Sequence, residues 1–486
     1  MHGDMVAVVE RKPIQYFNMC FPMDMTPIII NYMNESINAS QIAMNLKIPV
    51  TTGDFFSWLG IRLATVIEPK RGGIASYWST KPELQSIYNE GNYLKRFGMS
   101  KTRFEVMLNH LRVGPLVDPQ VNGEKDPWFS VRPFIDGFNN RQTQVIEPGP
   151  SLCVDECMSA WKGLSSSIAG IYGMPHVTKI PRKPEGVGTE MKSIACGDTK
   201  MIIGLDLMEG AVRNAAKEFN EFGAGTGQIL RLARKYFGSG RLIVADSAFS
   251  SVKTCVELRN RGLFFGGVIK TAYKQFPKNY LTDWLSQHSG RNDRGKYKLL
   301  RSIEPAQDNR PEFNIYGLAW SDKKGKQFVF STGITTEGRD SVRIRHKREW
   351  SEEMNDFISV QYEKRVKRPR IVEEIHDAFS TIDIHDHFRQ GSLAIERQWP
   401  TKKWQIRIFE TVFGMIITNS YLAYVYDQKM FRYGLEEPVM PFNDFLGMLA
   451  YQLVHNIFNE DEPNLRVIRN IVNPNQFNEV FFLFMT

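Results

Sequence analysis

The chain is poor in cysteine and lacks the patterns of secreted and membrane proteins. Its 486 residues include five cysteines, which form neither a CxxC pair nor a disulfide framework. No charged segment followed by an apolar stretch opens the chain, and no apolar run approaches the roughly 18 residues that span a bilayer. We therefore expect an intracellular protein with no membrane partner, and we expect its cysteines to be core residues: Cys20, Cys153, Cys157, Cys196 and Cys255.

The composition is that of a globular protein with an excess of positive charge. Hydrophobic residues make up 42% of the chain and charged residues 23%, a balance that argues against disorder. With 486 residues the chain is too long for one ordinary core, so we expect two or three packed units. The net charge of +8 and the pI of 9.0 favour a polyanionic partner such as nucleic acid, because Lys and Arg that neutralise phosphates release counterions.

The hydrophobic pattern divides the chain into five segments. Residues 1–145 show the apolar period of helices, and a Pro- and Gly-containing stretch marks a boundary near residue 145. Residues 146–271 alternate strand and helix patterns, whereas residues 272–345 have the pattern of a hairpin-rich insertion. We expect residues 346–430 to return to the core and residues 431–486 to form a helical tail.

Residues 146–271 carry the pattern of a sheet covered by helices. Two of its strands are joined by a turn at Gly197, Asp198 and Thr199. Apolar strands that alternate with helices imply that part of the sheet is parallel and covered on its faces, so we predict an α/β protein. The predicted strands are 151–156, 191–197, 201–208, 241–247 and 262–269, and the predicted helices are 227–237 and 251–262.

Four aspartates stand where they could bind a metal ion. Asp155 lies within a strand beside Glu156, where an acid is disfavoured unless it binds a cation or faces solvent on an edge strand. Asp246 follows an apolar strand, where open parallel sheets build their sites, although it can also cap the next helix. Asp383 and Asp386 lie three residues apart and share a helix face, which taken alone is typical of a solvated surface.

Carboxylates brought together select hard divalent cations. Their mutual repulsion makes such a cluster stable at neutral pH only with bound cations, and oxygen ligands favour Mg²⁺ or Mn²⁺. Two such ions can activate water or a 3′ hydroxyl and stabilise the leaving oxygen of a phosphodiester. In-line phosphoryl transfer then needs mainly positioning and charge stabilisation. The predicted chemistry is that of a nuclease or a strand-transfer enzyme.

Several motifs, in their order along most of the chain, resemble the piggyBac transposase family. The helical opening contains YWST at 77–80, followed by RFEVMLNHLRV and VRPFIDGFN. VDECMSAWKG at 154–163 resembles the first aspartate block of that family, and ADSAFSS at 245–251 resembles the second. STIDIHDHFRQGSLAIERQW at 380–399, with WQIRIF and NSYLAY behind it, resembles the third.

The resemblance implies a fold, an activity and a site. It implies an RNase H-like mixed-sheet catalytic core with a β-rich insertion, between a helical N-terminal region for dimerisation and DNA binding and a helical C-terminal segment. It implies a DDD transposase that binds two Mg²⁺ or Mn²⁺ ions through Asp155, Asp246 and Asp383, with Asp386 as a further metal-binding acid. The expected activity is cleavage and strand transfer at element ends in double-stranded DNA, with insertion at TTAA, by a homodimer in the nucleus.

The sequence also departs from the family pattern. Ser247 follows the second aspartate, where Asn is common, and Ser380 and Thr381 replace two glycines before the third. Leu164 stands where an Arg commonly follows Lys-Gly, and no cysteine after Cys255 could form the cysteine-rich module that closes many members. Every carboxylate remains, but two further functions stay open. One is a domesticated or decayed copy that binds DNA or proteins without catalysis, and the other is a repair nuclease.

Three other signals have simpler interpretations. GAGTGQ at 223–228 lacks the preceding strand and the Lys of a nucleotide loop, so we expect a turn with Thr226 capping the next helix. His385 and His387 diverge on a helix and are expected to be solvated or near phosphate, not to share a zinc ion. We interpret Asp206 as a strand position in a hairpin.

Two basic segments and one further acid complete the candidates. RIRHKR at 343–348 and KRVKRPR at 364–370 fit a nuclear localisation signal, a contact to the DNA backbone or a solvated surface. Asp322 fits a turn.

Overall fold

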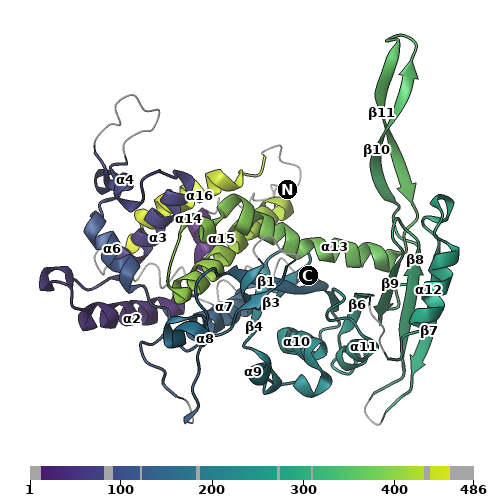
Figure 1. Ribbon diagram of the computed structural model, residues 1–486, viewed down its shortest axis with the longest axis horizontal. Helices are drawn as coiled ribbons and strands as arrows, with labels where there is room; N and C mark the ends of the chain where they lie inside the picture. The colour runs from purple at the N-terminus through teal and green to yellow at the C-terminus, as the bar shows by residue number, and fades with distance from the viewer. Residues whose placement is uncertain are drawn as a thin grey trace, which may run out of the picture.

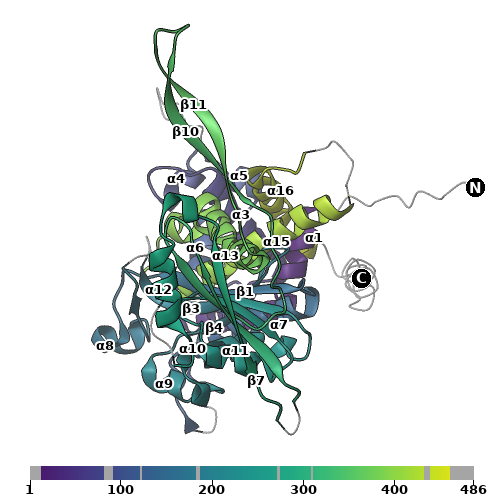
Figure 2. The ribbon, with the colours of Figure 1, turned by 90° about the vertical axis from the view of Figure 1, so that its right-hand side faces the viewer.

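Helices from both ends of the chain pack beside a central mixed sheet in the computed structural model, and a two-stranded arm projects from the far end of that sheet (Figure 1). The same arm stands clear of the body in the perpendicular view (Figure 2). The structure describes residues 12–80, 91–120, 123–181, 186–270, 274–307, 310–431 and 438–459.

The N-terminal region is helical, as its apolar period predicts. The side chain of Thr51 accepts from the backbone N–H of Asp54, whose carboxylate accepts from the backbone N–H of Thr51, so this capping box starts the long buried helix α3. Ser100 caps α6 in a similar way. The helices are α1 (Pro13–Cys20), α2 (Thr26–Ala39), α3 (Thr52–Ile67), α4 (Ile74–Trp78), α5 (Tyr93–Phe97), α6 (Lys101–His110) and α7 (Arg132–Val145).

Nine strands of the described chain form the central sheet, in the order β2-β3-β1-β5-β6-β9-β8-β7, with β4 paired to β3. β1, β5 and β6 run parallel to one another, and the other neighbours are antiparallel. The strands are β1 (Ser151–Ala160), β2 (Thr178–Lys179), β3 (Val187–Cys196), β4 (Ile202–Leu207), β5 (Leu242–Ala245), β6 (Phe264–Ile269), β7 (Tyr297–Glu304), β8 (Phe313–Trp320) and β9 (Lys326–Phe330). The predicted mixed sheet is confirmed.

Helices connect the parallel strands, as strand-helix-strand alternation predicts. α9 (Ala211–Ala215) and α10 (Ala224–Ala233) precede β5, and α11 (Val252–Arg259) leads to β6. The predicted cap of α10 is wrong. Gly223 occupies the N-cap position instead, with a φ of 94° that glycine adopts without strain. The buried Thr226 hydroxyl lies 2.9 Å from the Thr254 hydroxyl, and this contact joins α10 to α11.

The region after β6 extends the sheet and then leaves it. Helix α12 (Lys278–Gln287) covers β8, and pairing of β9 with β6 joins β7, β8 and β9 to the central sheet. The chain then forms the arm, which consists of β10 (Ser341–Ser351) and β11 (Asp356–Val366) in antiparallel register. The basic segment 343–348 lies in β10, and Lys364 and Arg365 lie in β11, so most of the basic residues of this part belong to a β-ribbon that the sequence pattern did not predict.

The C-terminal part is helical again. α13 (Arg370–Asp386) leads through a π-helical turn at His387–Leu393 to α14 (Ile395–Gln398), α15 (Trp404–Phe431) and α16 (Phe442–Val454), while the short α8 (Ser166–Ala169) lies beyond β1. Among the described helices, α15 alone has the length and hydropathy of a membrane span. However, 94% of its apolar stretch is buried inside the protein. It therefore fits the role of a core helix, packed by α1, α7 and α14.

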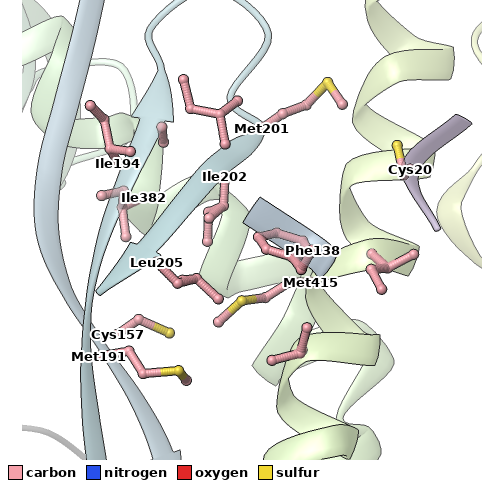
Figure 3. Close-up of a cluster of buried hydrophobic side chains, with 14 of the residues drawn as sticks. Cys20, Phe138, Cys157, Met191, Ile194, Met201, Ile202, Leu205, Ile382 and Met415 are labelled. Carbon is pink, nitrogen blue, oxygen red and sulfur yellow. The ribbon is translucent and has the colours of Figure 1, made fainter. Parts of the chain in front are cut away.

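The main core lies between β1, β3 and β4 on one side and α7, α13 and α15 on the other. Figure 3 shows Phe138, Ile382 and Met415 from these helices near side chains of the strands. All five cysteines are buried thiols, as predicted.

Candidate metal centre

The register of two parallel strands brings Asp155 and Asp246 together. β1 pairs with β5 from Ser151 opposite Leu242 to Val154 opposite Ala245. The residue after Val154 is Asp155 and the residue after Ala245 is Asp246, so the two aspartates stand side by side at the same level of the sheet. Because β1 lies inside the sheet, between β3 and β5, the edge-strand interpretation of Asp155 is wrong.

A third carboxylate joins this pair. Ligand atoms of Asp155, Glu156 and Asp246 all lie within 4.8 Å of one another, which makes a candidate metal site. Oxygen ligands of one Mg²⁺ ion are about 3–4 Å apart, so the group is near the size that a hard cation needs. Glu156 is 6% exposed and was not among the predicted ligands. The signal in the sequence was its place beside Asp155, but alternation along a strand argues that neighbours point apart.

Short hydrogen bonds fix the two aspartates. The backbone N–H of Ala248 donates to the Asp246 carboxylate at 2.8 Å, and the Ser250 hydroxyl donates to the Asp246 carbonyl at 2.7 Å. The backbone N–H of Glu156 donates to the Asp155 carboxylate at 2.7 Å. Asp246 is not the helix cap that was its alternative interpretation, since Ser251 caps α11.

One buried lysine offsets part of the negative charge. Lys192 stands opposite Glu156 in the register of β1 and β3. Its ammonium nitrogen lies 2.5 Å from a carboxylate oxygen of Glu190 and 3.7 Å from one of Glu156. Lys200 also acts on this region, since its charge opposes the rise that burial and the aspartates give to the pKa of Cys153. Lys192 therefore offsets part of the negative charge of the acids beside it, and a bound cation would offset more.

Helix α13 brings Asp383 to the same side of the sheet. α13 packs against β1, β3, β5 and β6. Burial raises the pKa of the Cys153 thiol in β1, the charges of Asp155, Asp383 and Asp246 raise it further, and the charge of Lys200 lowers it, so all three predicted carboxylates act on this residue. Asp383 is exposed and lies outside the group of three within 4.8 Å. The structure therefore brings Asp155 and Asp246 together directly and places Asp383 beside them.

The fourth predicted acid has a cationic partner. Asp386 accepts from Nε of Arg389 at 3.2 Å and from Nη2 at 3.0 Å. The Arg389 side chain is 1% exposed and also bonds Glu396. Nearby negative groups raise the pKa of this guanidinium against the effect of burial. The π-helical turn after α13 supplies Arg389, which links Asp386 to α14.

The histidines near the third aspartate differ from one another. His385 is fully buried, and burial lowers its pKa to about 4, so the expectation that it is solvated is wrong. His387 is exposed as expected. The sequence could not separate the two, because the groups that face His385, the Asn419 side chain and the Met415 backbone, come from α15.

The two competing acids are engaged elsewhere. Asp206 in β4 pairs with Lys217 and Arg231, both at 2.8 Å, and its place in the β3-β4 hairpin is confirmed. Asp322, in the turn between β8 and β9, pairs with Arg343 at 2.9 Å.

A basic cavity opens beyond the end of β1. It has a volume of about 800 Å³, and its lining includes the aromatic rings of Trp161 and Tyr172 and the cations of Lys162, Arg389, Arg397 and Lys402. Trp161 and Arg389 are buried, and Arg389 is paired with Glu396, which also lines the cavity, whereas Tyr172 is exposed. An exposed ring beside cations suits a phosphate chain that carries bases.

Two comparisons with known proteins found matches. A family model described as Transposase IS4, of the DDE type, matches residues 12–421. A solved structure, the "Cryo-EM structure of piggyBac transposase synaptic complex with hairpin DNA (SNHP)", superposes with a TM-score of 0.67 at 17% identity, over 96% of this chain and 86% of that chain. At this identity the likeness shows a shared fold. A search of curated proteins found no match.

Proposed function

Because the chain belongs to the IS4 transposase family of DDE type, we propose that it cleaves double-stranded DNA at the ends of a mobile element and joins those ends to target DNA. The observation that carries this proposal is the group of Asp155, Glu156 and Asp246 within 4.8 Å at neighbouring strands. Carboxylates so close together form a site for hard divalent cations.

We propose Asp155, Asp246 and Asp383 as the metal-binding and catalytic residues, with Mg²⁺ or Mn²⁺ as the ions. Two such ions, when bound, would activate the attacking oxygen and stabilise the leaving oxygen of a phosphodiester. Asp155 and Asp246 would hold them from the rigid sheet, and Asp383 would close the site from α13. Glu156 is a further candidate ligand, held from β3 by Lys192. Asp386 would support the site through its bond to Arg389.

The proposed partners are DNA and a second copy of the chain. The net charge of +8 supports binding to DNA. The relative of similar fold was solved as a synaptic complex with hairpin DNA, which supports the same partner here. Insertion at TTAA, a homodimer and a nuclear location remain proposals that rest on the sequence resemblance, and sequencing of insertion junctions tests the first of them.

The main test compares two proposed metal ligands with a control aspartate that is not proposed to bind metal. Asp246→Asn and Asp383→Asn should each abolish Mg²⁺- or Mn²⁺-dependent cutting and joining of element-end DNA, since each removes a ligand charge. Asp377→Asn is the matched control, because Asp377 lies exposed on the same helix as Asp383. Activity that persists in Asp246→Asn would disprove the assignment.

The alternative function has its own outcome in this assay. A domesticated or decayed copy predicts that the unmodified chain binds element-end DNA but neither cuts nor joins it with either ion. Cleavage without joining would instead favour the repair nuclease. Glu156→Gln tests whether the unpredicted acid is a ligand, because loss of a ligand lowers the affinity for Mg²⁺ and should raise the Mg²⁺ concentration needed for half-maximal activity.

A further inference from the structure

The arm is a β-ribbon that touches the rest of the described chain mainly at its base. β10 and β11 pair with each other from Ser341 opposite Val366 to Ser351 opposite Asp356, apart from the central sheet. Both faces are exposed along most of the length, and the ribbon points away from the body in both views (Figures 1 and 2). An isolated two-stranded ribbon is marginally stable in water, so an exposed one adds little to the stability of the fold and is a candidate for binding a partner.

The base of the arm is held firmly. Arg343 donates to both carboxylate oxygens of Asp322 at 2.9 Å, which ties β10 to the turn after β8. The indole N–H of Trp320 donates to the carbonyl of Lys367 at 3.0 Å, and Val366 is buried. These contacts fix the direction of the arm relative to the sheet that carries the acidic group.

The two faces of the arm differ in charge. Arg345 and Lys347 share one face with Arg343, and Lys364 stands directly opposite Arg343. We call these four cations the basic face. Asp322 already neutralises Arg343, and Lys347 is paired with Glu349. Among the described residues no acid is paired with Arg345 or Lys364, so these two cations are the ones that an anionic partner would neutralise. The opposite face carries Arg348 and Arg365 among mainly apolar and neutral residues.

The tip has the opposite charge. Glu349, Glu352, Glu353 and Asp356 gather where the strands meet. An anionic partner is therefore attracted to the inner part of the ribbon and repelled from its end. The basic segments thus resemble neither a uniform solvated surface nor an extended targeting peptide, because most of their residues are fixed in paired strands.

We propose that the basic face binds the phosphate backbone of duplex DNA outside the cleavage site. The proposal rests on the proposed function and names the part of the chain that grips flanking DNA. A two-stranded β-ribbon fits the major groove. Its strands of 11 residues span about 35 Å, which is long enough to lie across a duplex.

Helix α13 sets the distance between this contact and the chemistry. It begins at Arg370, directly after the arm, and carries Asp383 in its last turn. The 13 residue steps from Arg370 to Asp383 span about 20 Å, or roughly six base pairs of duplex. The arm should therefore contact DNA at least about six base pairs from the bond that is cut.

The test uses the full chain, a duplex of about 40 base pairs and a salt titration of the binding constant in EDTA. Each lost phosphate contact lowers the slope of log K against log salt by about 0.9. Arg345→Gln with Lys364→Gln should therefore lower the slope by about 2. Arg348→Gln with Arg365→Gln, the same charge change on the opposite face, should leave it nearly unchanged. Equal changes in the two variants, or no change in either, would overturn the proposal.

Two further readouts separate this proposal from the proposed function. Cleavage of a duplex that ends within about five base pairs of the cut should be the same in the basic-face variant and the unmodified chain, because the arm cannot reach such DNA. If no substrate is cut but the basic-face variant still shows the smaller slope of log K against log salt, the proposed function is wrong and the proposed DNA contact of the arm is supported. If sedimentation shows that the variant loses self-association and keeps its salt slope, the arm binds a second copy and the proposal is wrong.

Discussion

The body and the arm use their charged residues in opposite ways. In the body, Arg62 and Arg407 each lie 3.1 Å from a carboxylate oxygen of Glu410, whose side chain is 1% exposed. In the arm, Arg345 and Lys364 are exposed on a narrow ribbon. Charges that are buried and paired hold helices in one arrangement, whereas charges left in water remain available to a ligand.

The cost of the buried charges shows in their pKa values. Burial raises the pKa of Glu410 to about 8, even though two arginines act against this rise. Burial likewise lowers the pKa of Arg62 to about 10. Desolvation therefore outweighs attraction in this network, which joins α3 to α15 and contributes to a unique packing more than to net stability.

The largest expected effect comes from breaking this network. Arg62→Met leaves Glu410 buried with one partner and removes a guanidinium that lies 3.8 Å from the ring centre of Trp399. We expect a loss of about 3–5 kcal/mol in the free energy of unfolding, since the buried Glu410 loses one of its two cationic partners and the stacked guanidinium is removed. Urea unfolding followed by circular dichroism measures it.

A matched exposed pair provides the control. Arg96 and Glu68 form an ion pair at 2.7 Å with side chains that are 39% and 45% exposed. Arg96→Met should cost less than about 1 kcal/mol, because water screens the pair. Equal losses of unfolding free energy in Arg62→Met and Arg96→Met would show that burial does not determine how much an ion pair contributes to stability.

The sequence predicted those parts of the site that follow from one local pattern. Asp155 stands within one apolar strand and Asp246 follows another, and parallel pairing of two such runs can bring the two acids to the same level. The sequence did not indicate that Glu156 lies near Asp155 and Asp246. The period of a strand gives the face on which a side chain starts but not where a flexible carboxylate ends. The position of Asp383 depends on how α13 packs on the sheet, and only the family motif indicated it.

The arm was missed for a related reason. Its strands do alternate, since Val342 and Ile344 alternate with arginines and Ile358, Val360 and Tyr362 alternate with polar residues, but the dense positive charge hid this period. The register then places the apolar side of β10 and that of β11 on opposite faces, so the ribbon has no apolar face to bury. Thr226 shows the reverse case. Threonine is a residue type typical of the N-cap, but the N-cap of α10 has a positive φ, which glycine tolerates, and Gly223 occupies it.

A smaller effect is expected at the junction of body and arm. His376 of α13 packs against Trp320 and Phe328, and its ring nitrogen lies 3.1 Å from the Lys326 ammonium. Burial lowers its pKa to about 4, and the charges of Lys326 and Arg368 act in the same direction. Asp322 and Arg343, which anchor the arm, also face this ring, with opposing effects.

The sign of the pH effect follows from proton binding. Between pH 6.5 and about 4 the unfolded chain binds a proton at His376 that the folded chain does not, so stability falls as the pH falls through this window. We expect His376→Gln to reduce this loss by about 2 kcal/mol, and unfolding at pH 7 and pH 4.5 measures it. Buried His385 contributes in the same direction and remains in the variant. An unchanged pH dependence would contradict a neutral His376.

The smallest expected effect concerns the tip of the arm. Trp350 packs edge-on against Phe357 across the ribbon, with ring centres 5.2 Å apart, and both rings are exposed. Such a cross-strand pair contributes about 0.5–1.5 kcal/mol to local pairing. Trp350→Ala should therefore speed hydrogen exchange at amides of the arm and leave exchange in the central sheet and the global unfolding transition unchanged, because the arm opens separately from the core. A lower unfolding midpoint for the whole chain would show that arm and body form one cooperative unit, and the comparison between them would then fail.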